Sequence, residues 1–283
     1  MKPGTGKDIL PSVPASNLVQ RVLASLVLVP VAVGITYVGG IAFLTLLALL
    51  SALVMAEWLG ISKPPISNYL RRALPVFCAI CVAGLALEPP AAVAGLGLGA
   101  AIFAATAATE PRNIWIAAGL VYAGLPAMAL AMLRGSGFDG FLAVIFVFVV
   151  VWATDSGAYF AGRSLGGPKL APRISPKKTW SGAIGGALAA ILSALAFAYL
   201  ADLPALPILG LIALGLSVVA QLGDLAESAV KRYFGVKDSG SIIPGHGGVM
   251  DRLDGVVPAA VVAAAICIAH GGDGELASRL LRW

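Results

Sequence analysis

The stretch IAFLTLLALLSALVMAEWLG, residues 41–60, holds one charged residue in twenty positions. A helix needs about 20 predominantly apolar residues to cross the hydrocarbon core of a bilayer. Similar apolar runs recur along the whole chain, separated by Gly-, Pro- or charge-containing breaks. The stretch therefore predicts a transmembrane helix, one of several.

The composition of the whole chain leads to the same class of protein. Of its 283 residues, 59% are hydrophobic and 12% are charged, and the mean hydropathy is +0.94. A soluble domain carries about 25% charged residues, so this chain has about half the charge that a water-facing surface requires. A soluble enzyme, a disordered chain, a coiled coil and a collagen are all excluded. We predict an all-α integral membrane protein.

The apolar runs predict about nine transmembrane helices. The expected spans are 22–38, 41–60, 73–88, 91–108, 114–133, 138–154, 180–200, 204–222 and 255–270. The third and the ninth are short for a bilayer, and their helices are expected to extend into the flanking segments. Residues 1–20 are expected to form a flexible tail, 21–154 the N-terminal helices and 155–283 a C-terminal catalytic region. The first span lacks a clear cleavage site and is expected to be retained.

The lysines and arginines predict the orientation of the chain. With the N-terminus inside, 16 of the 19 fall on the cytoplasmic side and three on the other side. Basic residues collect on the cytoplasmic side of membrane proteins. The C-terminus is then outside, and two long polar loops face the cytoplasm. This orientation accounts for the net charge of +5, and no nucleic-acid partner is expected.

Several small-residue features are expected to be structural. Cys78 and Cys81 form a CxxC inside an apolar run, where neither metal nor redox chemistry is expected. The Gly182-xxx-Gly186 pattern is expected to let two helices approach closely. Glycine-rich spans are also compatible with a homodimer.

The polar segment Gln221–Asp254 carries the richer of two candidate sites. Five polar residues are spaced so that they share one face of a helix continuing the eighth span: Asp224, Glu227, Ser228, Lys231 and Arg232. An ionisable group such as Asp224, directly after an apolar run, is costly and is a functional candidate by default. A solvated helix end with ion pairs is the alternative.

A second acidic pair, Asp251 and Asp254, precedes the ninth span. Carboxylates at the ends of adjacent helices could converge on divalent cations, which prefer oxygen ligands. A salt-bridge cluster of these acids with Lys231, Arg232 and Arg252 is the other interpretation. Between the two acidic sites, the sequence PGHGG at 244–248 could bring backbone N–H groups close to a ligand, or form a flexible turn. His246 fits a hydrogen-bonding strut and a ligand contact equally.

The other polar segment runs from Asp155 to Trp180. Asp155 ends an apolar run, and SPKKT at 175–179 precedes the seventh span, with Thr179 or Ser181 as its expected N-cap. Adjacent lysines at a helix N-terminus oppose the helix dipole, a conflict that a bound phosphate would resolve. A plain positive-inside anchor is the alternative.

Together, these carboxylates, cations and glycine loops suit phosphoryl or nucleotidyl transfer with metal ions on the phosphates. A CTP- or ATP-dependent lipid kinase is the nearest competing function, and an ion-coupled transporter is a more distant one. No GxxxxGK[ST] loop and no Ser–His–Asp unit is found in the sequence.

The same residues resemble a known family signature, that of phosphatidate cytidylyltransferase. The resemblance lies in Ser228-x-Val230-Lys231-Arg232, Lys237-Asp238-x-Gly240 and Pro244-x-His246-Gly247-Gly248-x-x-Asp251-Arg252-x-Asp254. It extends upstream to Gln221-x-Gly223-Asp224-Leu225-x-Glu227-Ser228, to Asp155–Tyr159 and to Ser175-Pro176-x-Lys178-Thr179-Trp180, so that the close match covers about 155–258. Residues 1–150 match in helix pattern only, with Arg21 and Glu57 as candidate family positions. Where the family has Phe-Gly-Lys, this chain has Leu165-Gly166-Gly167, and a family lysine is missing.

The resemblance implies the reaction CTP + phosphatidate → CDP-diacylglycerol + pyrophosphate, with Mg2+, in a cavity open to the cytoplasm and the lipid. It assigns catalysis to Asp224, Lys231 and Asp251, with Asp224 and Asp251 as metal ligands. It assigns binding to Ser175, Lys178, Thr179, Ser228, Arg232, Lys237, His246 and Arg252. The expected partners are CTP, phosphatidate and membrane lipids, in a bacterial cytoplasmic membrane. The roles of Asp155, Glu227 and Asp254 stay open.

Overall fold

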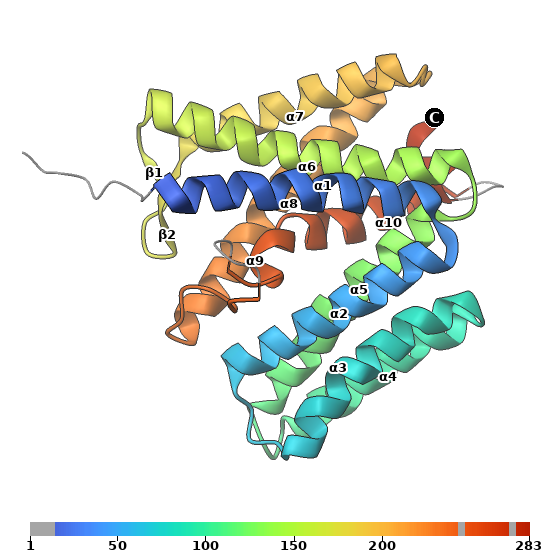
Figure 1. The fold of residues 1–283 in the computed structure, drawn as a ribbon, viewed down its shortest axis with the longest axis vertical. Helices are drawn as coiled ribbons and strands as arrows, with labels where there is room; N and C mark the ends of the chain where they lie inside the picture. Colours follow the sequence, from blue (N-terminus) through green and yellow to red (C-terminus); the bar gives the residue numbers. More distant parts are fainter. Residues whose placement is uncertain (1–14, 243–246, 272–275) are drawn as a thin grey trace, which may run out of the picture.

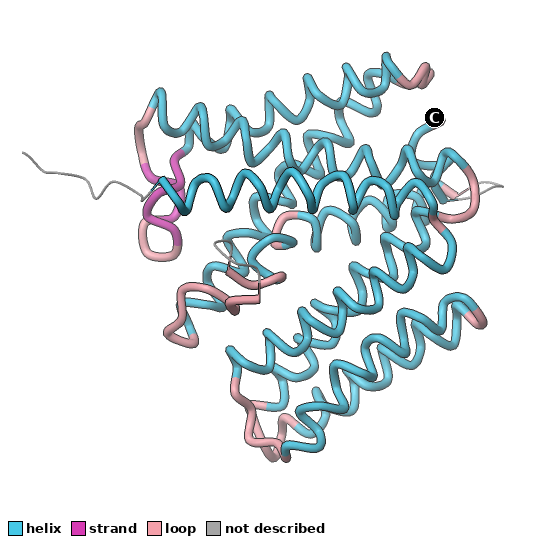
Figure 2. The backbone as a smooth tube through the Cα atoms, in the orientation of Figure 1, coloured by secondary structure: helices cyan, strands magenta, loops and turns pink. Residues whose placement is uncertain are grey.

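The computed structural model describes residues 15–242, 247–271 and 276–283 and is almost entirely helical (Figures 1 and 2). The helices are α1 (Ala15–Val38), α2 (Gly40–Ser62), α3 (Asn68–Ala83), the 3-10 turn η1 (Gly84–Ala86), α4 (Pro89–Thr106), α5 (Asn113–Arg134), α6 (Phe138–Leu165), α7 (Trp180–Leu200), α8 (Leu206–Tyr233), α9 (Met250–Leu253), α10 (Val256–His270) and α11 (Leu276–Leu281). The strands are β1 (Lys169–Ala171) and β2 (Ser175–Thr179). Most of the predicted tail, residues 1–14, and His246 lie outside the described residues, and α1 begins at Ala15.

Within the described residues, seven helices are long and apolar enough to cross a membrane, namely α2 to α8 with η1 continuing α3. Each coincides with one of the nine predicted spans. The third predicted span does extend into its flanks, because its helix begins at Asn68. The two remaining spans are represented by shorter apolar helices, Leu26–Val38 within α1 and Val256–His270. The ninth span does not extend, since α9 and a break at Asp254–Gly255 precede it.

The first polar segment departs from the all-helical prediction. Its strands β1 and β2 pair antiparallel, with Lys169 opposite Thr179, and form the short hairpin drawn in magenta in Figure 2. The hairpin forms because α6 ends at Gly166, whose φ of +62° continues no helix, and Gly167 follows with φ +99°. Gly167 stands where the family has a lysine, and the two glycines together turn the chain back toward α7.

Helices α6 and α7 pack closely through a stripe of small residues. The buried positions of α7 recur at every fourth residue: Gly182, Gly186, Ala190, Ala194 and Ala198. A Cβ on Gly186 would lie 2.8 Å from the carbonyl oxygen of Thr154, and one on Gly182 would lie 2.9 Å from that of Ala158. The predicted role of Gly182-xxx-Gly186 in close helix approach is confirmed.

The opposite face of α7 carries large apolar side chains that point outward. Ile184, Leu188 and Leu192 are 59%, 56% and 67% exposed. A soluble monomer rarely exposes a continuous stripe of this kind, whereas a bilayer is a favourable solvent for it. Small residues inside and large apolar residues outside identify an all-α membrane protein.

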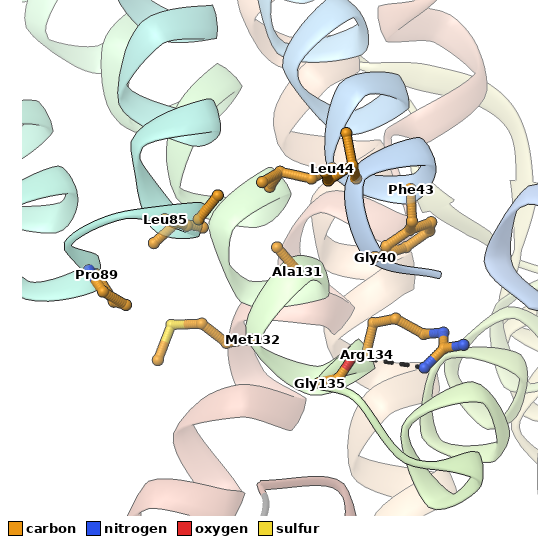
Figure 3. Close-up of a pocket in the computed structure, with 11 residues that line it drawn as sticks. Gly40, Phe43, Leu44, Leu85, Pro89, Ala131, Met132, Arg134 and Gly135 are labelled. Carbon is orange, nitrogen blue, oxygen red and sulfur yellow. Dashed lines mark hydrogen bonds between the residues drawn. The ribbon is translucent and has the colours of Figure 1, made fainter. Parts of the chain in front are cut away.

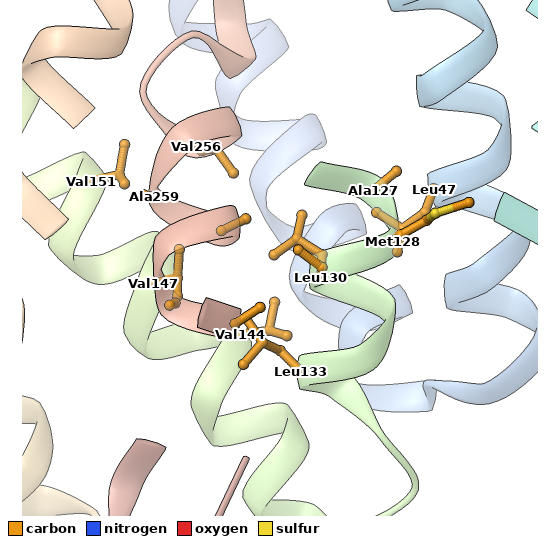
Figure 4. Packing of buried hydrophobic residues seen from close by; sticks show 14 of the residues in the cluster. Leu47, Ala127, Met128, Leu130, Leu133, Val144, Val147, Val151, Val256 and Ala259 are labelled. Atoms are coloured by element: carbon orange, nitrogen blue, oxygen red, sulfur yellow. The ribbon is translucent and has the colours of Figure 1, made fainter. Parts of the chain in front are cut away.

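The middle of the bundle is an apolar core shared by the consecutive helices α5 and α6 and by α10, which is distant from them in the sequence. Figure 4 shows Leu130 and Leu133 of α5, Val144 and Val147 of α6, and Val256 of α10 around one another. Leu133, Val144 and Val147 are fully buried. Because α10 packs against both α5 and α6, the C-terminal helices are fixed to the N-terminal ones, and the polar segment before α10 is fixed with them.

A cavity of about 340 Å³ lies at the beginning of α2 and is lined mainly by apolar residues (Figure 3). Arg134, at the end of α5, is a buried charged residue that lines this cavity. The guanidinium donates to the carbonyl oxygens of Thr36 (2.6 Å), Tyr37 (2.8 Å) and Gly137 (3.0 Å). Arg134 thus ties the α1–α2 turn to the α5–α6 turn, and its hydrogen bonds hold backbone rather than facing the cavity.

Candidate active site

The polar end of α8 carries a buried ion-pair cluster. The Lys231 ammonium lies 2.8 Å from Glu227 Oε1 on the same helix and 2.6 Å from Asp251 Oδ1 on α9. The three side chains are between 0% and 12% exposed. Tyr122 of α5 donates its hydroxyl proton to Glu227 Oε2 at 2.9 Å. The predicted stripe on α8 therefore exists, and part of it points into the bundle rather than into solvent.

Asp251 also organises the backbone around it. Its Oδ2 accepts hydrogen bonds from the backbone N–H of Ser239 (2.9 Å), the Ser239 hydroxyl (2.8 Å) and the backbone N–H of Gly248 (2.9 Å). Burial opposes ionisation, but the Lys231 ammonium and these N–H groups hold the pKa of Asp251 below its ordinary value. Asp251 is therefore an anion with most of its oxygen lone pairs already in use.

Glu57 of α2 reaches the same loop from the other side of the cluster. Its Oε1 accepts the backbone N–H of Val249 at 2.9 Å, and its Oε2 accepts that of Met250 at 2.8 Å. The Ser239 hydroxyl lies 3.1 Å from Glu57 Oε2. This hydroxyl bridges Glu57 and Asp251, so that the N-terminal helices hold the loop before α9.

Asp224 and Lys178 join the two polar segments. Lys178 Nζ, on β2, lies 2.5 Å from Asp224 Oδ2 on α8, and both side chains are partly exposed. The Ser228 hydroxyl lies 3.4 Å from Asp224 Oδ1. The residue predicted to bind metal and the residue predicted to bind phosphate thus form an ion pair with each other. The salt-bridge interpretation of the acids holds for Lys231, which is paired with Glu227 and Asp251. Lys178 is a further partner, which that interpretation did not include.

Thr179 links the hairpin to α7. It is the N-cap of that helix, and its hydroxyl oxygen accepts the backbone N–H of Gly182 at 3.1 Å. Of the two expected caps it is therefore Thr179 that holds the position, while Ser181 donates to the carbonyl oxygen of Gly166. Ser175 lies at the start of β2 and is partly buried. The cap places Lys178 one residue before the N-cap of the helix.

Three predicted phosphate-binding cations lie at the exposed rim of the cluster. Arg232 donates to the carbonyl oxygen of Val236 at 2.9 Å, beyond the end of α8. Lys237 is exposed on the loop that follows, and Arg252 is exposed on α9. The predicted contact at His246 falls outside the described residues. Lys231, which is largely buried, and Lys178, which is partly exposed, are thus paired with acids, whereas the three cations at the rim are exposed.

Carboxylates outnumber cations in this region. Burial and the negative charges of Asp224, Glu227 and Asp155 raise the pKa of Asp254 to about 8. Among the described residues, no group of three His, Cys, Asp or Glu side chains is arranged to hold a metal ion as it stands. The excess of carboxylate oxygens suits a hard divalent cation. One of these carboxylates, Asp224, forms an ion pair with Lys178.

Sequence reasoning missed the contacts of Glu57, Tyr122 and Ser239. A signal did exist for Glu57, which is the one charged residue of the 41–60 run and therefore an intramembrane carboxylate. No local signal existed for Tyr122 or Ser239, because their hydrogen-bond partners Glu227 and Glu57 are 105 and 182 positions away. Such pairs are visible only after the helices have packed.

Comparisons with known proteins show the family of the chain. The chain matches the cytidylyltransferase family over residues 19–270. It is 46% identical over 253 residues to a phosphatidate cytidylyltransferase of Brucella suis, covering 87% of this chain and 92% of the relative. It is 50% identical over 135 residues to one of Bacillus subtilis, covering 47% of this chain and 50% of the relative. The matched range includes every described residue of the polar cluster, and the chain belongs to the cytidylyltransferase family.

Proposed function

We propose that this protein transfers the cytidylyl group of CTP to phosphatidate, giving CDP-diacylglycerol and pyrophosphate. The observation that carries the proposal is the paired cluster in which β2 meets α8 through Lys178 and Asp224, and α8 meets α9 through Lys231 and Asp251. Membership of the cytidylyltransferase family favours nucleotidyl transfer over the kinase and transporter alternatives. The relatives that support this substrate pair are themselves named phosphatidate cytidylyltransferase.

The chemistry requires two anions to meet. A phosphate oxygen of phosphatidate attacks the α-phosphorus of CTP, and the bond to the bridging oxygen of pyrophosphate breaks. Phosphatidate is already anionic at neutral pH, so charge neutralisation matters more than a strong base. In this proposal, Lys178 leaves Asp224 for the phosphates of CTP, with Thr179 and Ser175 beside it. Arg232, Lys237 and Arg252 stand at the exposed rim, where departing pyrophosphate would be met.

We also propose that Mg2+ is the cofactor, held by Asp224 and Asp251, with the Ser228 hydroxyl beside Asp224. When bound there, Mg2+ would neutralise phosphate charge and orient the oxygens. The fit rests on the donor set: carboxylate oxygens crowd this end of α8, and burial together with their negative charges raises the pKa of Asp254 to about 8. Lys231 holds Asp251 and Glu227 in fixed positions, so these side chains would be preorganised before a ligand binds.

The remaining expectations complete the proposal. The 16-to-3 division of lysines and arginines supports a cytoplasmic N-terminus and cytoplasmic polar segments. Helix α1, with 24 residues, and α10 would bring the count of spans to nine. The membrane would be the bacterial cytoplasmic membrane, and the glycine-rich spans would allow a homodimer. A mass measurement of the protein in lipid nanodiscs tests the homodimer.

The position of the transferred label tests the reaction itself. Purified protein, phosphatidate and Mg2+ are incubated with CTP labelled at either the α- or the γ-phosphate, and the lipid is extracted. Label from the α-phosphate in the lipid phase, with pyrophosphate released, is the expected result. Label from the γ-phosphate would make the protein a lipid kinase instead. If neither label enters the lipid and EDTA changes nothing, nucleotidyl transfer is wrong for this chain.

A further inference from the structure

We infer that Glu57, an intramembrane carboxylate of α2, is a positioning residue that holds the loop before α9 and thereby sets the places of Asp251 and Lys231. The inference rests on the proposed function, because it assigns to Glu57 a part in cytidylyl transfer. It names a residue of the N-terminal helices, outside the segment that carries the family signature.

The contacts of Glu57 all lead to one short loop. Both of its oxygens accept backbone N–H groups, from Val249 at 2.9 Å and Met250 at 2.8 Å. The Ser239 hydroxyl lies 3.1 Å from Glu57 Oε2 and 2.8 Å from Asp251 Oδ2. One hydroxyl proton is thus shared between the two carboxylates, so that displacement of either one changes the position of the other.

The burial of Glu57 shows that these contacts are specific. Its side chain is 6% exposed in a helix that otherwise contains no Asp, Glu, Lys or Arg. An ionisable group in such a helix is costly unless hydrogen bonds compensate it. Here the compensation comes from backbone N–H groups of the loop, 192 and 193 positions away in the sequence. The hydrogen bonds of Glu57 therefore stabilise the loop before α9 rather than α2 itself.

The two glycines nearest to Glu57 show how tightly the loop is fitted. A Cβ on Gly248 would lie 2.6 Å from each Glu57 oxygen and would also collide with the Ser239 hydroxyl. A Cβ on Gly240 would lie 2.9 Å from Glu57 Oε1. The backbone therefore passes directly against the carboxylate. Such close approach is what glycine permits and other residues prevent.

The loop in turn positions the catalytic pair. Gly248 and Ser239 donate their backbone N–H groups to Asp251 Oδ2, and Asp251 Oδ1 holds Lys231 at 2.6 Å. The path from Glu57 to Lys231 is thus an unbroken series of hydrogen bonds through Ser239 and Asp251. Glu57 touches none of the residues assigned to the phosphates of CTP, namely Lys178, Thr179 and Ser175. It should therefore affect kcat more than the KM for CTP.

Three substitutions of Glu57 and one control separate positioning from general stability. In Glu57→Gln, one oxygen becomes an NH2 group that faces backbone N–H donors, and in Glu57→Ala both acceptors are lost. Glu57→Asp keeps both oxygens on a shorter side chain. The control is Ser62→Ala, because Ser62 is buried on the same helix and donates to the carbonyl oxygen of Trp58 at 2.8 Å, away from the loop.

Two measurements are made on each variant in lipid nanodiscs: the steady-state kinetics of CDP-diacylglycerol formation, and amide hydrogen exchange of residues 247–255. Glu57→Gln and Glu57→Ala are expected to lower kcat about 10- to 100-fold, the range found for supporting partners of active-site ligands. The KM for CTP should change little, and the amides of Val249 and Met250 should exchange faster. Glu57→Asp should recover part of the lost kcat, and Ser62→Ala should match the unsubstituted protein in both measurements.

The outcomes distinguish this inference from the proposed function. Unchanged kcat in Glu57→Gln would overturn the inference. So would an increase in exchange spread evenly over all helices with kcat per folded molecule unchanged, because that pattern indicates general stabilisation. If the unsubstituted protein makes no CDP-diacylglycerol, the proposed function fails, while the exchange at Val249 and Met250 still shows whether Glu57 holds the loop.

Discussion

Lys231 Nζ lies 2.6 Å from Asp251 Oδ1 and 2.8 Å from Glu227 Oε1, and so joins the end of α8 to α9 across a buried interface. The sequence presents Lys231 and Asp251 as two separate catalytic candidates, twenty positions apart. The structure makes them one unit, in which neither charge is stable without the other.

Replacement of Lys231 by methionine is expected to abolish turnover and to destabilise the protein by about 3–5 kcal/mol, since it leaves two buried carboxylates without their cation. The thermal unfolding midpoint in detergent and the rate of CDP-diacylglycerol formation check this. Lys237→Met is the matched comparison, because Lys237 is exposed; its midpoint should stay at that of the unsubstituted protein. Equal midpoints for the two variants would contradict the buried cluster.

Asp224→Asn is expected to abolish turnover while leaving the protein folded in the membrane. Asp224 is partly exposed, and its partner Lys178 can turn to solvent, so the cost to stability is small, as for surface ion pairs. Activity assays over a range of Mg2+ concentrations, together with unfolding midpoints, check this. Near-normal activity in this variant would remove Asp224 from the proposed Mg2+ site.

The stability of the protein without divalent cations is expected to fall as pH rises. Burial and nearby carboxylates raise the pKa of Asp254 from 3.8 to about 8, so the folded state holds a proton that the unfolded state has released between these values. This contribution is complete below pH 3.8 and is lost as pH rises through about 8. Unfolding midpoints in EDTA should decline over this window, and less steeply for Asp254→Asn. Parallel profiles for the two proteins would refute this origin of the pH dependence.

Gly248→Ala is expected to reduce activity strongly, because the added Cβ would lie 2.6 Å from both Glu57 oxygens and collide with the Ser239 hydroxyl. Gly60→Ala is the control on α2: a Cβ there meets nothing within 4 Å. The control should keep its activity and gain a little stability, since alanine favours a helix over glycine by about 1 kcal/mol. Activity assays of both variants check this prediction. An active Gly248→Ala variant would mean that the loop does not pack closely against Glu57.

Arg134→Lys is expected to lower stability without lowering the turnover of the protein that remains folded. Its guanidinium holds carbonyl oxygens from two turns, including Thr36 at 2.6 Å and Gly137 at 3.0 Å, in a fork that an ammonium group cannot reproduce. Arg134, at the end of α5, contacts the turn before α2, whereas Glu57 lies near the other end of α2. The length of α2 between these two places is roughly 25 Å. The unfolding midpoint and the turnover per folded molecule check this, and a selective loss of turnover would contradict it.

The parts of the fold that could be predicted are those that depend on neighbouring residues in the sequence. Apolar runs long enough for a bilayer predicted α2 to α8, which in the described part of the chain are the helices long and apolar enough to cross a membrane. A helix in lipid must satisfy its backbone within itself, so this signal is local. The hairpin of β1 and β2 was missed, since it depends on the left-handed turn at Gly166 and Gly167. The short α10 was expected to extend; it begins at Val256 and is preceded by a separate four-residue helix, α9.

The candidate site divides in the same way. Spacing by three and four residues on α8 predicted that Asp224, Glu227 and Lys231 share a face, and the 2.8 Å pair of Glu227 and Lys231 follows from that spacing. The spacing could not show that Lys178 would reach Asp224 from another segment. Nor could it show that Glu57, which the sequence marked only as a candidate family position, would hold the loop before α9.

The sequence by itself thus determined that this is a helical membrane protein whose polar residues gather in two segments, because hydrophobicity and helix periodicity are properties of neighbouring residues. Only the tertiary structure decided which charges meet. Glu57 and Ser239 are 182 positions apart, and Tyr122 and Glu227 are 105 apart. Their contact depends on the packing of α2, α5, α8 and α10 around a shared core, and a buried carboxylate in that core is stable only where such distant donors arrive.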